Sequence, residues 1–86
     1  MIDFPLYRKF SDNKTFYKIH SSKSFLEIKL MGKFYFRNEI EAKQFPEMLL
    51  INDMIKLEVG GWIAIDENEF EENYSFIKKN YELKDW

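Results

Sequence analysis

The chain has 86 residues, carries a net charge of −2 at pH 7 and contains no cysteine. This length predicts a single domain over residues 1–86, and the lack of thiols excludes disulfides and zinc–thiolate sites. Nine Phe, five Tyr and two Trp supply the bulk for a core that would otherwise be thin. No apolar run is long enough to span a membrane, and no secretory signal is recognisable at the start. We therefore expect a cytoplasmic protein with no membrane contact.

The first predicted unit is a β-hairpin formed by residues 6–10 and 15–20. The loop between them contains an Asp-Asn pair, and both residue types tolerate left-handed backbone in tight turns. A loop centred on this pair places Leu6, Phe10 and Ile19 on one face, as a half-buried ribbon requires. The predicted register sets Leu6 opposite Ile19 and Arg8 opposite Tyr17.

The second predicted hairpin spans residues 25–31 and 34–42 around Gly32-Lys33. Apolar and polar residues alternate in both runs with a period of two, which is typical of strands with one buried face. A two-residue loop pairs Met31 with Phe34 and would set the two apolar faces on opposite sides of the ribbon. We therefore expect a three-residue loop over 31–33 or a bulge at Gly32. The expected pairs are Leu30 with Phe34, Ile28 with Phe36, and Glu27 with Arg37.

The middle of the chain is less regular. Pro46 cannot donate to a central ladder, so the segment around it is expected to interrupt the sheet. Residues 48–51 are expected to resume a strand, and residues 52–57 fit either a capped helical turn or part of a strand that runs to residue 59. Gly60-Gly61 favours the strand, because a type I′ turn needs positive φ at both central residues. The third expected hairpin pairs Val59 with Trp62 and Leu57 with Ala64.

The last predicted element is a helix over residues 67–81. Asp66 is its expected N-cap, with Glu69 three residues later as in a capping box, and Ile65 and Phe70 form a hydrophobic staple. One helix face carries the apolar stripe Phe70, Tyr74, Ile77 and Tyr81. Together the elements predict an α+β fold: a curved antiparallel sheet or small open barrel of five or six strands, in three hairpins, with one C-terminal α-helix packed on it.

No residue pattern indicates a catalytic function, a metal site or a cofactor, so we expect a protein that is not an enzyme. His20 is the only histidine, and the sequence around it contains no recognisable nucleophile or orienting partner. The acids of residues 66–72 fall on successive helix positions, which suits a solvated first turn better than a cation site. Gly60-Gly61 lacks the spacing and the Lys-Ser/Thr of a phosphate-binding loop.

The charge of the chain is distributed unevenly. Residues 1–45 contain nine Lys or Arg and five Asp or Glu, a balance of +4, whereas residues 46–86 contain four and ten, a balance of −6. Lysines and aromatic residues on small curved sheets can bind single-stranded nucleic acid, although two arginines provide little for base recognition. The candidate residues for a nucleic-acid-binding face are Arg8, Tyr17, Lys18, Lys33, Tyr35 and Arg37.

A second candidate surface lies behind the helix. Phe76, Leu83 and Trp86 are rotated away from the apolar stripe, so the sheet cannot bury all of them. They fit a tail that rests on the domain as well as a contact patch for a partner. The sequence therefore predicts a non-catalytic protein-interaction or regulatory module, with a protein partner or a homo-oligomer. A small single-stranded nucleic-acid-binding domain resembling a β-barrel is the alternative.

Overall fold

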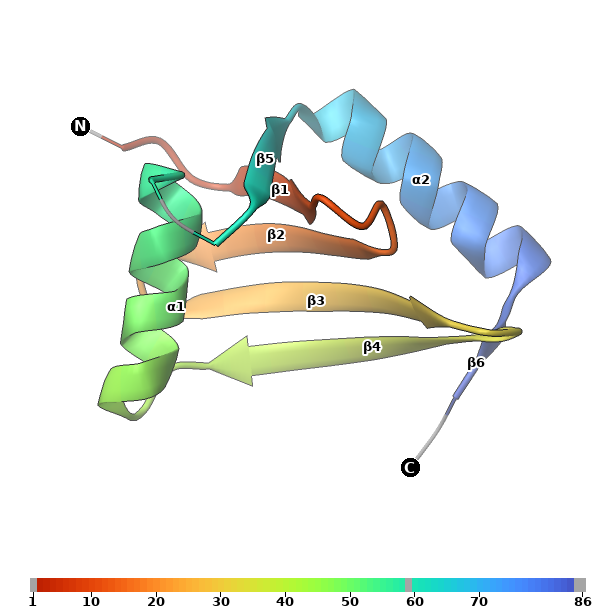
Figure 1. The fold of residues 1–86 in the computed structure, drawn as a ribbon, viewed down its shortest axis with the longest axis horizontal. Helices are drawn as coiled ribbons and strands as arrows, with labels where there is room; N and C mark the ends of the chain where they lie inside the picture. The colour runs from red at the N-terminus through yellow and green to blue at the C-terminus, as the bar shows by residue number, and fades with distance from the viewer. Residues whose placement is uncertain (1, 59, 85–86) are drawn as a thin grey trace.

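The computed structural model describes residues 2–58 and 60–84, which form one open six-stranded sheet with two helices (Figure 1). The fold is α+β, as expected, but the sheet does not close into a barrel. The strand order is β5-β1-β2-β3-β4-β6, and all neighbours are antiparallel except β4 and β6. In chain order the elements are β1 (Leu6–Phe10), β2 (Thr15–Ser21), β3 (Ser24–Met31), β4 (Phe34–Glu41), α1 (Phe45–Lys56), β5 (Trp62–Ile65), α2 (Glu67–Asn80) and β6 (Glu82–Leu83).

The first hairpin has the predicted register between β1 and β2. Its turn depends on the residue types that the sequence places there. Asn13 has φ +58, in the left-handed region. The Asp12 carboxylate accepts a hydrogen bond of 2.8 Å from the Lys14 amide, as in an Asx turn.

The predicted register of the second hairpin is wrong. β3 and β4 are joined by the two-residue turn Gly32-Lys33, where Gly32 has φ +62 and Met31 pairs with Phe34. The expected three-residue loop or bulge depends on the assumption that only one face of this ribbon is buried. Both faces are in fact covered, so the apolar residues of β3 and β4 do not have to share a side. The observed pairs are Leu30 with Tyr35, Ile28 with Arg37, and Glu27 with Asn38.

The sheet is the middle layer between the two helices. Neighbouring residues of one strand enter different clusters: on β2, Phe16 points to α2 and Tyr17 points to α1. Because successive side chains of a strand point to opposite faces, the two helices cover opposite faces of the sheet. The buried residues of the α2-side cluster are Tyr7, Phe16, Leu26, Ile28, Tyr35, Phe70 and Ile77. Those of the α1-side cluster are Tyr17, Ile19, Phe25, Ala42, Ile51 and Met54.

The segment expected to be a strand at residues 48–51 is helical and belongs to α1. Pro46 lies in the first turn of this helix, where a missing amide hydrogen costs nothing because the first amides have no intrahelical partner. Ile51 and Met54 are buried, and Leu50 and Ile55 pack partly buried beside them. This is the i, i+3, i+4 spacing of a single helix face. The helix continues to Lys56, so the helical alternative for residues 52–57 is the closer one.

The third expected hairpin does not form. Leu57 ends α1 in left-handed backbone, and Val59 lies outside the described residues. Trp62 pairs instead with Phe10 of β1, as the first residue of edge strand β5. Gly60 is required because the Trp62 ring folds over it, and a Cβ at this position would overlap the ring. The glycine pair therefore provides a close approach to an aromatic ring and does not form a hairpin turn.

Helix α2 forms as predicted. Asp66 caps it, because its side chain accepts a hydrogen bond of 2.8 Å from the Glu69 amide. Ile65 and Phe70 contact the same α2-side cluster, which confirms the hydrophobic staple. The Lys9 ammonium pairs with the Glu69 carboxylate at 3.2 Å and ties β1 to the first turn of the helix.

Arg8 holds α1 against the sheet. Only 8% of its surface is exposed. Its Nε donates to the Met54 carbonyl at 2.8 Å, and its guanidinium also reaches the carbonyls of Tyr7 at 2.8 Å and Ile55 at 3.4 Å. Among the described residues no carboxylate pairs with it. The carbonyls of the last helical turn carry the negative end of the helix dipole, so they take the place of a counter-ion. Burial lowers the pKa of Arg8.

Replacing Arg8 with leucine is expected to lower the free energy of unfolding by about 2–4 kcal/mol, because buried carbonyls lose a charged donor. Arg37→Leu is the matched control, since Arg37 is exposed and its contacts are solvated, and we expect a loss below about 1 kcal/mol. Urea unfolding followed by circular dichroism measures both. Equal losses for the two variants would contradict the role of Arg8.

Leu57→Gly is expected to raise the free energy of unfolding by about 0.5–1 kcal/mol. Leu57 has φ +61, a conformation that costs an L-residue about 1–2 kcal/mol and glycine almost nothing, partly offset by the greater freedom of glycine in the unfolded chain. Leu57→Ala keeps the unfavourable backbone and is expected to bring no gain. The thermal midpoint compares the two, and an equal rise for alanine would show that the effect comes from the lost side chain.

Candidate binding groove at the end of α2

The end of α2 is joined to the β3–β4 turn by the short strand β6. Tyr81 leaves the helix in extended backbone, with φ −128 and ψ 154. The Glu82 amide then donates to the Lys33 carbonyl at 3.2 Å, and the Lys84 amide donates to the Tyr35 carbonyl at 2.8 Å. These two hydrogen bonds fix the last turn of the helix beside a turn that lies almost fifty positions earlier in the chain.

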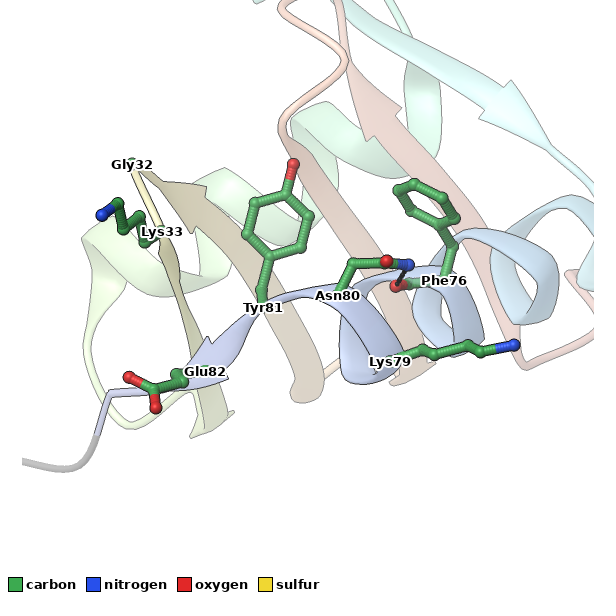
Figure 2. Close-up of a pocket in the computed structure, with 7 residues that line it drawn as sticks. All are labelled: Gly32, Lys33, Phe76, Lys79, Asn80, Tyr81 and Glu82. Atoms are coloured by element: carbon green, nitrogen blue, oxygen red, sulfur yellow. Dashed lines mark hydrogen bonds between the residues drawn. The ribbon is translucent and has the colours of Figure 1, made fainter.

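An open groove lies between these two segments (Figure 2). Its volume is about 700 Å³. Phe76 is 61% exposed, the second highest value among the large apolar side chains of the described residues. Tyr81 is partly buried and packs against the α2-side cluster. The lining residues, from both sides of the groove, are Gly32, Lys33, Phe76, Lys79, Asn80, Tyr81 and Glu82.

The positive charges of the groove have no counter-ions within the described part of the chain. Lys33 and Lys79 form no ion pair there. The Asn80 side chain is engaged, because its amide donates to the Phe76 carbonyl at 2.8 Å. The groove therefore offers two cationic groups and an exposed phenyl ring, with Glu82 as the single acid of its wall.

The predicted contact patch is brought together only in part. Phe76 lines the groove, whereas Leu83 lies on β6 opposite Tyr35 and is not among the lining residues, although it is 54% exposed. Trp86 lies outside the described residues. Lys33, Lys79 and Tyr81 were not part of the patch predicted from the helix. Their proximity depends on the pairing of β6 with β4, and two residues are too few to show a strand pattern.

The six residues considered for nucleic-acid binding do not form one surface. Arg8, Tyr17 and Tyr35 are buried, and they divide between the two faces of the sheet. The other three lie apart: Lys18 rests over the Tyr7 ring at 5.9 Å, Arg37 donates to the Tyr74 hydroxyl at 3.1 Å, and Lys33 lines the groove.

His20 lies at the other end of the sheet, in a second hollow. Its Nε2 is 3.2 Å from Glu39 Oε2, and the other oxygen of Glu39 accepts from Arg37 at 3.4 Å. The Ser21 and Ser24 hydroxyls bond to each other at 3.2 Å, and among the described residues neither is hydrogen-bonded to His20. The hollow thus contains an imidazole and a carboxylate without an activated nucleophile. Its lining residues are His20, Ser21, Lys23, Ser24, Glu39, Ile40 and Glu41.

Further features of the described residues bear on function. No group of three or more His, Asp or Glu residues there could hold a metal ion. No helix in that part of the chain is long and apolar enough to cross a membrane. Comparison of the chain with protein-family models, with curated proteins and with solved structures finds no significant match.

Tyr17 is expected to make the protein sensitive to alkaline pH. Burial, with a smaller contribution from the negative charge of Glu27, raises the pKa of Tyr17 to about 12 from its ordinary value of 10.0. The folded state keeps this proton where the unfolded state loses it, so stability falls as pH rises from about 10 to about 12. Over this pH range the free energy of unfolding falls by about 2–3 kcal/mol. Urea unfolding at pH 8 and pH 11 measures this effect. The free energy of unfolding is expected to fall less between the two pH values in Tyr17→Phe than in the unmodified protein, and an equal fall in both would refute this cause.

Proposed function

We propose that this protein is a non-catalytic module of the cytoplasm that binds another protein, and that its contact surface is the groove at the end of α2. The observation that carries the proposal is the exposure of Phe76 in a groove that is also lined by two lysines without counter-ions among the described residues. Exposed aromatic side chains are typical of interface centres, where their burial on binding supplies much of the affinity.

The fold supports this assignment because Phe76 is not required for packing. The buried residues of α2 are Phe70 and Ile77, on the opposite side of the helix from solvent, and Phe76 contributes to neither core cluster. A partner can therefore cover Phe76 without disturbing the packing of either core cluster.

Selection of peptides from a random displayed library against the folded protein tests the proposal. We expect selected peptides to lose at least tenfold in affinity on Phe76→Ser, because the central apolar contact is removed. Phe45→Ser is the matched control, since Phe45 is 71% exposed and lies on α1, at the opposite end of the sheet (Figure 1). Peptides that depend on Phe45, or on neither residue, would disprove the assignment.

A further inference from the structure

The groove belongs to a positively charged end of the molecule. Figure 1 shows the β1–β2 turn, the β3–β4 turn and the last turn of α2 at the same end of the sheet. The Lys14 carbonyl accepts from the Leu30 amide at 2.8 Å, which brings the first turn beside the end of β3. This end has six lysines, from these three turns and from the residues next to them on β3 and after β6: Lys14, Lys29, Lys33, Lys78, Lys79 and Lys84.

Few acids oppose these lysines. Within residues 11–15, 29–34 and 76–84 the only carboxylates are Asp12 and Glu82, so six positive and two negative charges leave a balance of +4. The whole chain carries −2, so the remaining residues carry −6. Asp12 is already engaged by the Lys14 amide and the Thr15 hydroxyl. This end therefore takes three lysines from residues 1–45 and three from residues 46–86.

These lysines are also positioned without neutralisation. None of them forms an ion pair with a carboxylate of the described residues. Two rest on aromatic rings, Lys78 over Tyr74 at 4.3 Å and Lys84 over Phe34 at 5.0 Å, which orients the ammonium groups but leaves their charge available. Lys33 and Lys79 line the groove together with Phe76, and uncompensated cations beside an apolar side chain attract an anionic ligand and repel a cationic one.

We propose that the segment bound in this groove is an acidic peptide with an apolar anchor, its carboxylates pairing with Lys33 and Lys79 and its anchor covering Phe76. This inference rests on the proposed function and specifies the partner. Phe76 and Lys79 line the α2 side of the groove, and Lys33 lies across it at the β3–β4 turn, so a ligand with carboxylates near an apolar residue can reach both lysines while it covers Phe76.

A peptide is favoured over a nucleic acid by the composition of this end. It contains no arginine, which is the residue best suited to bidentate contacts with phosphates and bases. Glu82 lies in the wall and would repel a continuous phosphate backbone, whereas a peptide can place an amide hydrogen beside it. Tyr81 is partly buried against the core, so Phe76 alone offers an open face for stacking.

Fluorescence anisotropy with a labelled acidic peptide containing one central phenylalanine tests this inference. The comparison peptide carries the isosteric amide in place of every carboxylate. We expect the acidic peptide to bind at least tenfold more tightly, and this preference to shrink as NaCl is raised to about 0.5 M, where screening is short-ranged. Equal binding of the two peptides would overturn the inference.

Matched variants locate the effect. The double variant Lys33→Glu, Lys79→Glu is expected to lower the affinity for the acidic peptide at least tenfold. The double variant Lys33→Gln, Lys79→Gln adds no negative charge at the end of the helix, and it is expected to lower the affinity by a smaller factor. Lys23→Glu with Lys43→Glu makes the same charge change at the other end of the sheet and is expected to leave binding unchanged. Equal losses in the two charge-reversed variants would show that net charge alone governs binding and would overturn the inference.

Three further outcomes bear on this inference and on the proposed function. If library-selected peptides depend on Phe76 but are neutral or basic, the interaction module stands and the acidic partner does not. If oligothymidylate binds through Lys33 and Lys79 and displaces the acidic peptide, the peptide assignment is wrong and the ligand is a nucleic acid. If no peptide binds in a Phe76-dependent manner, both proposals fail.

Discussion

The contact between the Arg8 guanidinium and the last carbonyls of α1 is the constraint on which the arrangement of the other elements depends. It holds the end of α1 next to β1. From there the chain has only residues 57–61 before the next strand begins, so β5 can reach the free edge of β1 but no distant strand. Asp66 follows β5 directly, and α2 therefore starts at this edge and crosses the opposite face of the sheet.

The same contacts explain why α1 has a defined position although its ends are weakly capped. Gln44 provides no side-chain hydrogen bond at the start of α1, and Leu57 closes the helix in unfavourable backbone. Local preferences alone make α1 a weak helix. Its stability comes from burying Ile51 and Met54 on the sheet and from a cation that neutralises its carbonyl end. Tertiary contacts therefore decide both its position and its length.

The sequence predicted those elements whose determinants are local. The Asp66 cap, the staple and the stripe of α2 all lie within one helix, and the Asp-Asn turn determines the register of the first hairpin. The errors have two origins. Pro46 suits a helix start as well as an interruption of the sheet, and without α1 the sheet needs only one covered face, which leads to the wrong register at Gly32. The third hairpin depends on a type I′ turn at Gly60-Gly61, whose positive φ values belong instead to the connection that precedes β5. The groove could be predicted only through Phe76, since its lysines meet through a pairing of two residues on β6.

That pairing has a consequence for the dynamics of the groove. β6 contributes one wall, yet it is only two residues long and pairs with β4 at two positions, Glu82 with Phe34 and Leu83 with Tyr35. Strands in the centre of the sheet open only with the whole domain, whereas so short an edge strand detaches in a local fluctuation of low free-energy cost. One side of the groove is thus the turn between β3 and β4, which central strands hold in place. The other side is β6, which is expected to detach from the sheet more often. A ligand that spans both would slow this opening, so the entropy of ordering the C-terminal segment becomes part of the affinity.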